Sequence, residues 1–408
     1  MKIFNRITNN SDKKKMTIII LSAAPKSTAT KSIINAGVKR GHNMIVLDPK
    51  YLYLVVSDAE SGYDRVFDGY DQRNKPVRIK AKDIDAVISR IGKNLAYGTS
   101  VLHHFRYNLG IFTTQSPEGI KIASDKLLSL QKISSAKIKV PKTVIADNSV
   151  HIDWLVNQIG GLPAIAKTLR GSQGVGVIIL ESERQTNTTL ETFYKQKTKL
   201  LLQQFIDSNA TDIRAIVIDN KVVVAMKRTS NTNDFRANIS LGGSGEKIIL
   251  SDADKEMCIK ASNACGLTVS GVDLLKDANG TSYIIEVNTN YGYHVESITG
   301  VDISTPLIKY CEENYKGGNK NNTTNKYDNV ETNKRIPIQQ MFSEIAEWGN
   351  DSDFSNYLDE IDTLFAKVTY IAVRSNFDEN LKYADVKLVS EFENLKRKLV
   401  VQKSANNL

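Results

Sequence analysis

Residues 166–180, AKTLRGSQGVGVIIL, decide how the middle of the chain folds. The residues before the loop are mostly small or β-branched and those after it are β-branched, so we expect two strands joined by a loop with three glycines. A dinucleotide-binding fingerprint needs a helix after its glycines, and a P-loop needs Lys-Ser or Lys-Thr after its second glycine. Here Val177 follows Gly176 and the next residues are strand-like. The stretch therefore predicts a β-hairpin with a glycine-rich tip.

The tip and the lysine before it suit an anionic ligand. Glycines allow backbone N–H groups to close over an anion without obstruction by side chains. Lys167 lies on the incoming strand, where it can reach phosphate oxygens as a point charge. A flexible hairpin with a surface lysine explains the same residues equally well. The loop alone therefore leaves both interpretations open.

Three oxygen-bearing side chains occupy apolar strands near residue 280. Asp273 lies within VSGVDLL, and Glu286 and Asn288 lie within SYIIEVN. Residues two apart on a strand share one face, so Glu286 and Asn288 point the same way. A carboxylate among apolar residues is costly unless it is paired or bound to metal. Buried ion pairs account for any one of these residues, but three oxygen donors after a phosphate-type loop favour Mg²⁺ shared with nucleotide phosphates.

The segment between the loop and the carboxylates is polar and basic. Within MKRTSNTNDFRANISLGGSGEK we single out Arg228, Arg236 and Asn238. The guanidinium fork matches the oxygens of a phosphate or an acyl phosphate. A solvated polar loop has the same composition, so this segment supports a phosphate site only together with the others.

The remaining chain predicts an α/β domain first and a separate segment last. Residues 17–23, 43–49 and 83–91 read as strands, with a helix between the first two; this alternation predicts a parallel sheet covered on both faces. The basic and apolar start also imitates a signal peptide, but the helix and strand that follow favour a first strand. Residues 117–139 predict one helix that starts at Pro117 and ends before Pro141.

Composition limits the class of protein. The 408 residues carry a formal net charge of +9, without a long basic block or a nucleic-acid motif, so an anionic small ligand or an acidic partner is the favoured interpretation. No apolar run is long enough to span a bilayer. The three cysteines lack CxxC spacing, which favours buried thiols in a reducing cytoplasm over a disulfide framework or a zinc site. They are Cys258, Cys265 and Cys311.

Taken together, these motifs resemble the ATP-grasp carboxylate–amine ligases, most closely the RimK type. The resemblance runs from about residue 17 to about residue 312. It rests on eight stretches in the order of that family. They read SRIGKNLAYGTSVLHHF, ASDKLLSLQKI, AKTLRGSQGVGV, LLQQFI, DIRAIVI, DFRANISLGG, VSGVDLL and IIEVN.

The resemblance implies a role for each matching residue. Lys126 and Lys167 would contact the phosphates of ATP, residues 204–205 would meet adenine through backbone groups, and Asp212 would lie near the ribose. Gln204 stands where the family has an acidic residue, which backbone recognition tolerates. The implied nucleotide-binding set is Lys126, Lys167, Gly171, Ser172, Gln173, Gly174, Gly176, Gln204, Phe205, Asp212, Arg236 and Asn238. The implied catalytic residues are Arg228, Arg236 and Asn238, and the implied metal ligands are Asp273, Glu286 and Asn288.

The resemblance also implies a reaction and its partners. ATP, with two Mg²⁺ or Mn²⁺ ions, would convert a carboxylate to an acyl phosphate, which an amine then attacks to form an amide. The family most often adds glutamate to a protein or peptide C-terminus, as a cytoplasmic protein modification, and homo-oligomers are common in it. Two alternatives stay open: a small-molecule or carrier-protein amino-acid ligase, and a non-catalytic ATP-binding adaptor or assembly protein. Tyr291 and Tyr293 stand where the family has small or rigid residues, so the acceptor is not fixed.

The fold class that follows is mixed α/β and α+β. We expect an ATP-grasp fold with an N-terminal Rossmann-like pre-ATP-grasp domain and a small, mainly helical C-terminal extension of unknown role. The expected parts are a flexible arm (1–15), the pre-ATP-grasp domain (16–115), a first ATP-grasp lobe with the glycine-rich lid (116–205), a second lobe with the metal site (206–314), a polar linker (315–335) and the extension (336–408).

Overall fold

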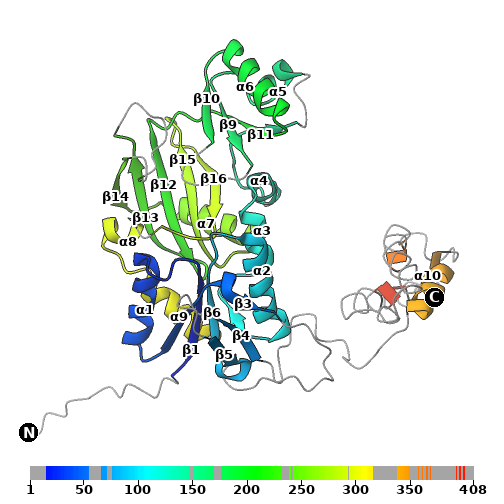
Figure 1. Ribbon diagram of the computed structural model, residues 1–408. Coiled ribbons are helices and arrows are strands. Elements are labelled where there is room, and N and C mark those ends of the chain that lie inside the picture. Colours follow the sequence, from blue (N-terminus) through cyan, green and yellow to red (C-terminus); the bar gives the residue numbers. More distant parts are fainter. Residues whose placement is uncertain are drawn as a thin grey trace, which may run out of the picture. The chain divides into compact units, whose positions relative to one another are not determined.

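The chain forms two compact units, Met1–Gly318 and Asn319–Leu408, in the computed structural model (Figure 1). The residues that the structure describes are 15–54, 66–70, 76–146, 151–169, 176–231, 239, 242–292, 294–315 and 338–349, with single positions between 357 and 399. The expected mixed fold class is confirmed: the first unit contains one parallel and three antiparallel sheets. The expected linker lies almost entirely outside the described residues.

A four-stranded parallel sheet organises the N-terminal part of the first unit. In spatial order its strands are β2 (Asn43–Leu47), β1 (Thr17–Ser22), β6 (Ala86–Arg90) and β7 (Phe112–Thr113). The first apolar run, β1, is thus a strand, as expected, and it lies inside the sheet because it pairs with β2 on one side and with β6 on the other. Since β1 is apolar on both faces, it fits only the buried centre of such a sheet.

Helices cover both faces of this sheet. Helix α1 (Thr28–Lys39) and helix α9 (Ser304–Asn314) pack together on the face that presents Ile18 and Ile20. Helix α2 (Leu95–His103) lies on the opposite face, against Ile19 and Leu21, and continues as a π-helical turn, His104–Asn108. The alternation of neighbouring residues between two cores explains the continuous apolar run of β1.

Two local expectations for this region need correction. The single helix over 117–139 is in fact two helices, α3 (Pro117–Ala123) and α4 (Lys126–Ser135). The break occurs because the side chain of Asp125 accepts a hydrogen bond from the N–H of Leu128, capping a new helix. A small antiparallel sheet was also not expected; its strands are β3 (Leu52–Tyr53), β4 (Val66–Tyr70) and β5 (Pro76–Lys80).

The first lobe of the following region is built on the hairpin that the sequence predicts. Its antiparallel sheet, in spatial order, consists of β10 (Val177–Leu180), β9 (Ala164–Thr168), β11 (Leu200–Gln204) and β8 (Thr143–Ile145). Helices α5 (Ile152–Gln158) and α6 (Glu183–Lys195) pack on it through a shared apolar core. Lys167 pairs with Val177, which confirms the hairpin register on either side of the glycine-rich tip.

The second lobe is a five-stranded antiparallel sheet. Its strands, in spatial order, are β14 (Ser244–Ile248), β13 (Lys221–Thr229), β12 (Thr211–Ile218), β15 (Val269–Lys276) and β16 (Ser282–Asn288). Helix α7 (Asp252–Ala264) packs on one face of this sheet, through Cys258 and Ala261. The other face carries the polar side chains of the site, while Ile216, Ile218 and Met226 on the same face join the core of the first sheet. Helix α8 (His294–Thr299) follows β16 and contacts β13 and β14.

The second unit has its own small core. Helix α10 (Ile338–Gly349) contributes Met341 and Ile345, which lie with Ile361 and Leu364 in one apolar cluster. Within this cluster the ring of Trp348 stacks on Phe392 at 5.0 Å between centroids. No helix in the described part of the chain is both long and apolar enough to cross a membrane.

Candidate active site

Two lysines lie near a glutamate of β16: one comes from the first-lobe sheet, and the other from helix α4, which packs against β16 and α7. Lys167 lies on β9, and Lys126 begins α4, whose first N–H reaches the carbonyl of Leu169 just beyond β9 at 3.4 Å. The ammonium of Lys126 lies 4.0 Å from a carboxylate oxygen of Glu286 on β16. The fold thus brings together three of the residues that the sequence singles out, across more than 100 positions of chain.

Lys167 is held by an amide. Its Nζ donates to the side-chain oxygen of Gln203 at 2.8 Å, and the Gln203 nitrogen donates to the hydroxyl of Thr143 at 2.9 Å. The pKa of Lys167 falls to about 8, mainly because of burial; Glu286 and Asp273 oppose this shift and the charge of Lys126 adds to it. A desolvated ammonium beside a second one favours an anion, because bound phosphate would compensate both charges.

The three expected metal ligands share one face of the second-lobe sheet. Asp273 on β15 is the register partner of Glu286 on β16, and Asn288 lies two residues further along, opposite Gly271. The Asn288 side-chain nitrogen is 3.4 Å from an oxygen of Asp273. Among described residues no three His, Cys, Asp or Glu side chains gather, so the oxygen donors of this cluster are two carboxylates and one amide.

Arginines, however, already surround Asp273. Arg214 of β12 donates to both of its oxygens, at 2.7 and 2.5 Å, and Arg228 of β13 approaches one of them at 3.2 Å. Burial alone would raise the pKa of Asp273, but these two arginines outweigh it and hold the pKa below its usual range. The ion-pair alternative left open for a single carboxylate therefore applies to Asp273, whereas among the described residues Glu286 faces lysines, with Lys126 at 4.0 Å.

Arg228 also forms a buried ion pair with Asp212, which extends the group of charges around Asp273. They are register partners on β13 and β12, and Arg228 donates to both carboxylate oxygens of Asp212 at 2.5 and 2.7 Å. Arg228 is 4% exposed and Asp212 9%. The ribose role of Asp212 and the phosphate role of Arg228 stay predictions, because the two side chains are engaged with each other.

The donor set fits a divalent ion in chemistry and in placement. Asp273, Glu286 and Asn288 bring oxygen donors to one face of two neighbouring strands, and Glu286 is a third exposed. Hard oxygen ligands suit Mg²⁺, which usually takes one or two carboxylates together with substrate phosphates. Asp273 could join such an ion only after exchanging part of its arginine bonding. Nucleotide phosphates would offer those arginines an alternative partner.

The hinge and the loop's last glycine are within the described residues. The N–H of Gln204 bonds to the carbonyl of Lys142 at 2.8 Å, so this N–H is used within the sheet; Phe205 follows it, half-buried. Gly176 has a φ of +76°, and a Cβ there would lie 2.7 Å from the Thr168 hydroxyl oxygen. This position therefore requires glycine.

The other expected nucleotide-site residues lie outside the described part of the chain. Four belong to the glycine-rich tip and two to the segment after β13. They are Gly171, Ser172, Gln173, Gly174, Arg236 and Asn238.

The sequence did not indicate two residues of the site, Arg214 beside Asp273 and Gln203 beside Lys167. Arg214 lies two positions after Asp212 on one strand, so the period of two could have placed both on the same face. Gln203 precedes the hinge in LLQQFI, and nothing in the sequence indicates its contact with Lys167. Both side chains hold groups to which the sequence assigns a role.

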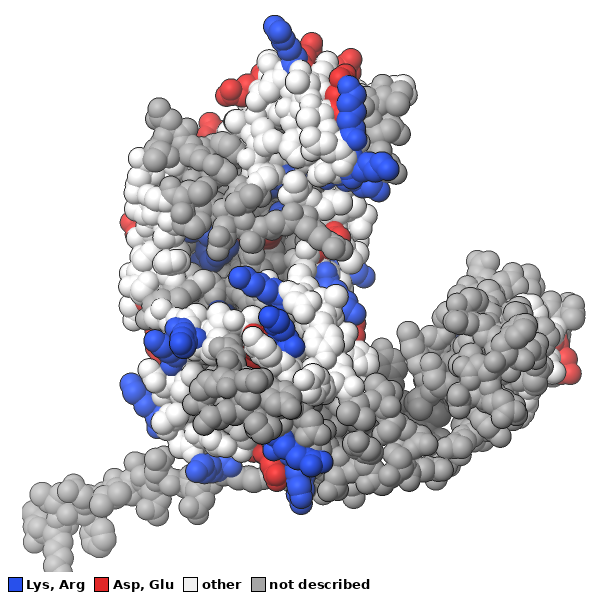
Figure 2. All heavy atoms as spheres, viewed as in Figure 1, with Lys and Arg blue, Asp and Glu red and all other residues white. Residues whose placement is uncertain are grey.

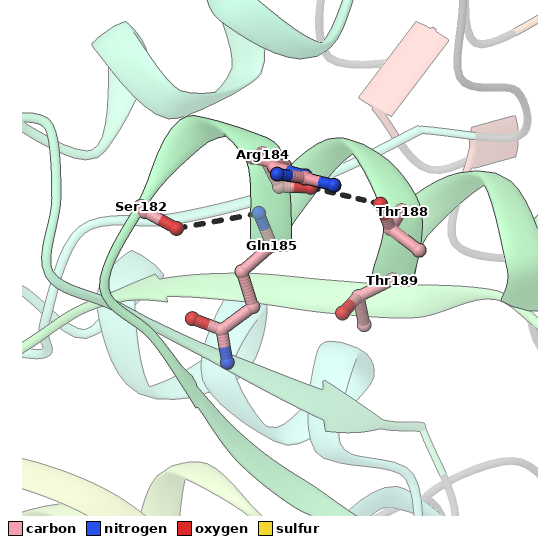
Figure 3. A pocket seen from close by; sticks show the side chains of 5 residues that line it. All are labelled: Ser182, Arg184, Gln185, Thr188 and Thr189. Carbon is pink, nitrogen blue, oxygen red and sulfur yellow. Dashed lines mark hydrogen bonds between the residues drawn. The ribbon is translucent and has the colours of Figure 1, made fainter.

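Other surface features do not coincide with this site. A shallow hollow of about 350 Å³ lies along the first turns of α6, lined by Ser182, Arg184, Gln185, Thr188 and Thr189 (Figure 3). Its hydrogen bonds, Ser182 to the N–H of Gln185 and Thr188 to the carbonyl of Arg184, are local to the helix. On the face shown in Figure 2, Lys and Arg side chains occur in several separate groups over the described residues.

Comparisons with known proteins agree with this geometry. Residues 16–120 match the RimK pre-ATP-grasp domain and residues 123–311 the RimK-like ATP-grasp domain. The chain is 33% identical over 305 residues to a probable alpha-L-glutamate ligase 1 of Shewanella denitrificans, covering 73% of this chain and 98% of that protein. It is 34% identical over 306 residues to a probable alpha-L-glutamate ligase of Thioalkalivibrio sulfidiphilus, covering 73% and 96%.

A solved structure shares the fold. The ATP-grasp ligase PsnB, in complex with a phosphomimetic variant of its minimal precursor, Mg and ADP, superposes with a TM-score of 0.55 at 19% identity, over 74% of this chain and 98% of that one. The matched domains end at residue 311, so the unit Asn319–Leu408 lies beyond them.

Proposed function

The chain belongs to the RimK-like ATP-grasp ligases, which form carbon–nitrogen bonds, and from that premise we propose that it joins glutamate to the C-terminus of a protein or peptide. Ligases of this family bind ATP and magnesium. The observation that carries the proposal is the gathering of Lys126, Lys167 and Glu286 beside Asp273. The glutamate ligases of similar sequence support the choice of amino acid.

In the first step a substrate carboxylate oxygen attacks the γ-phosphorus of ATP, the bond to the bridging oxygen breaks, and ADP leaves. Lys126 and Lys167 hold the phosphates and disperse their charge during transfer. One or two divalent ions, Mg²⁺ or Mn²⁺, would be held by Asp273, Glu286 and Asn288, and when bound would neutralise charge on the phosphate oxygens. Arg214 and Arg228 stand beside Asp273, where they can turn to the transferred phosphoryl group.

In the second step the amine of glutamate attacks the acyl carbon. The carbon–oxygen bond to phosphate breaks, inorganic phosphate leaves, and the nitrogen loses a proton to solvent as the amide forms. Within this proposal the glycine-rich tip closes over the phosphates and excludes water, which would otherwise hydrolyse the acyl phosphate. Arg236 and Asn238 line the acyl-phosphate site.

The acceptor is the least constrained part of the proposal. PsnB binds a precursor peptide, which supports a peptide acceptor for this fold. A small-molecule or carrier-protein acceptor uses the same chemistry, so the assay must separate these classes. A cytoplasmic location, also part of the proposal, is supported by three buried thiols without a disulfide partner in the described residues.

Phosphate release tests the proposal. The protein is incubated with ATP, Mg²⁺, glutamate and, in separate arms, peptides with free C-termini, amidated peptides and small carboxylic acids. We expect release only with free C-termini, with each product heavier by one or more glutamyl residues in mass spectrometry. Lys167→Ala and Glu286→Ala should each reduce the rate by roughly 100-fold or more. Release that both variants leave unchanged would exclude the assigned site, and release with small acids alone would replace the peptide acceptor.

A further inference from the structure

The carboxyl ends of β1 and β6 form a second polar edge in the first unit. The chain leaves β1 toward β2 on one side, and β6 joins on the other, so this is the point where the strand order reverses. In open parallel sheets, ligands bind outside the carboxyl ends of the strands at such a point. Ser22 and Arg90, register partners at this edge, follow Ile20 and Ile88 at the strand period of two and face the α1 side.

Arg90 is a guanidinium without an acidic partner among the described residues. Its two terminal nitrogens donate only to the carbonyl of Tyr291, each at 3.3 Å, and its carbon lies 4.9 Å from the centre of the Tyr291 ring. Burial lowers the pKa of Arg90, with Tyr291 opposing the shift. Glu296 of α8, which also lies against α1, is bonded by Ser32 instead. Arg90 is half-buried, and a guanidinium whose only acceptor among the described residues is a carbonyl retains donors for an anion.

The beginning of α1 adds a second positive group on the same face. The Ser27 side chain caps only the N–H of Thr30, and the helix has no acidic residue in its first turn. The hydroxyl of Thr30 is 3.4 Å from that of Ser22, the partner of Arg90. The first N–H groups of a helix lack intrahelical acceptors and carry partial positive charge, so they attract carboxylates.

Unused polar atoms accompany Arg90 in this seam. The hydroxyl of Tyr291 and the side-chain oxygen of the neighbouring Asn290 are buried without a hydrogen-bond partner in the described part of the chain. Tyr291 is 3% exposed. Since buried polar groups normally find partners, these two adjacent oxygens beside Arg90 indicate a place that a polar ligand completes.

This edge adjoins the candidate active site. Tyr291, against which Arg90 lies, follows β16 three residues after Asn288. A Cβ placed on Gly271 would lie 3.6 Å from the Cβ of Tyr291 and 3.8 Å from the Cδ of Arg214. Arg214 in turn holds Asp273. Tyr291 therefore lies near both Arg90 and Gly271, which in turn is next to Arg214.

We propose that Arg90 and the first turn of α1 bind a carboxylate of the incoming amino acid. This inference rests on the proposed function. The carboxylate that is phosphorylated must lie at the γ-phosphate, near Lys126 and Lys167, and it is consumed in the reaction. The amino acid instead keeps its own carboxylates throughout, so a fixed cationic anchor can hold it while its amine faces the acyl phosphate. Arg90 is thereby a specificity-determining residue.

Glutamate binding to the nucleotide-loaded enzyme tests this anchor. The full chain, saturated with Mg²⁺ and a non-hydrolysable ATP analogue, is titrated with glutamate, its α-amide and glutamine in a calorimeter. For the wild type we expect at least tenfold weaker binding of one of the two amides. Arg90→Gln should weaken glutamate binding by about 10- to 100-fold and remove that preference, since a charged hydrogen bond is lost. Arg90→Lys, which keeps the charge without the fork, should give an intermediate loss.

The controls separate this inference from a fold defect and from the proposed function. Arg184→Gln, a matched change in the hollow on α6, should bind glutamate like the wild type, and all variants should bind the ATP analogue within about twofold. Unchanged glutamate affinity in Arg90→Gln and Arg90→Lys overturns the anchor, as does an equal loss for glutamate and both amides. Glutamate binding through Arg90 without phosphate release toward any acceptor would overturn the proposed function and leave the anchor in place.

Discussion

Two neighbouring clusters of the candidate site differ in how completely their charges are paired. We call them the strand network, made of Asp212, Arg214, Arg228 and Asp273, and the lysine corner, made of Lys126, Lys167, Gln203 and Glu286. In the network, Arg214 and Arg228 surround Asp273, and Arg228 also holds Asp212. In the corner, Lys167 has an amide for a partner, and Glu286 has an ammonium 4.0 Å away. The corner can therefore accept a phosphate and a metal ion directly, whereas the network must first exchange bonds. The paired charges around Asp273 therefore stabilise the sheet, whereas the incompletely paired charges at Lys167 and Glu286 are suited to binding a ligand.

The largest effect should come from breaking the network at Arg228. Arg228→Met leaves Asp212 buried without its cation, which should lower the free energy of unfolding by about 3–5 kcal/mol. Urea denaturation followed by circular dichroism measures the change. Lys255→Met, in an exposed pair with Asp252, should leave the denaturation midpoint unchanged. A decrease of less than about 1 kcal/mol in the free energy of unfolding of Arg228→Met would show that these ion pairs do not stabilise the fold.

A smaller effect should follow from loosening the network at Arg214. Arg214→Gln removes two charged hydrogen bonds from Asp273, so its oxygens become available to a cation. We expect Mn²⁺ to bind the nucleotide-free variant about 10- to 30-fold more tightly than the wild type, as measured by electron paramagnetic resonance of free Mn²⁺. Tighter binding should disappear when Glu286→Gln is added. Equal Mn²⁺ affinity in the single variant and the wild type would show that the arginine does not compete with metal.

The smallest effect concerns pH at the lysine corner. With a pKa of about 8, Lys167 loses its proton as the pH rises through that value, and with it one positive charge for phosphate. The dissociation constant of ADP should therefore rise roughly five- to tenfold between about pH 7 and pH 9. Lys167→Arg, which stays charged, should flatten this profile, as fluorescence titration would reveal. A wild-type profile as flat as that of the variant would contradict the role given to this ammonium.

The lowered pKa of Lys167 also makes the stability of the fold depend on pH, but stability increases with pH whereas ADP binding weakens. Between about pH 8 and the ordinary lysine pKa of 10.5, the unfolded chain still binds the proton that folded Lys167 has released. The free energy of unfolding should therefore increase with pH across this interval, through this group.

Much of the fold could be predicted because local signals agreed with it. The β-branched runs of β1, β12 and β16 form strands, and the residues on either side of the glycine-rich tip pair as the expected hairpin. The helix break at Asp125 was missed although a capping residue was present, because the apolar spacing continues across it. Short strands such as β3 are fixed by their partners rather than by their own residues.

The site was predictable in its residue types but not in its partners. The period of two places Glu286 and Asn288 on one face, and that much is readable from the chain. The ion pair of Asp273 with Arg214 depends on β12 lying beside β15, which no local pattern specifies. The neighbourhood of Arg90 likewise requires a strand of the first sheet to meet the chain after β16, about 200 positions away.

The strand order of the second lobe also sets the order in which the catalytic face can assemble. Strands β12 and β13 form one hairpin and β15 and β16 another, each from neighbouring chain. The contact between β12 and β15 closes a far longer loop, so we expect it to form after the two hairpins. Arg214 and Asp273 lie on either side of that junction. The ion pair between them therefore depends on the docking of the two hairpins and not on either hairpin alone.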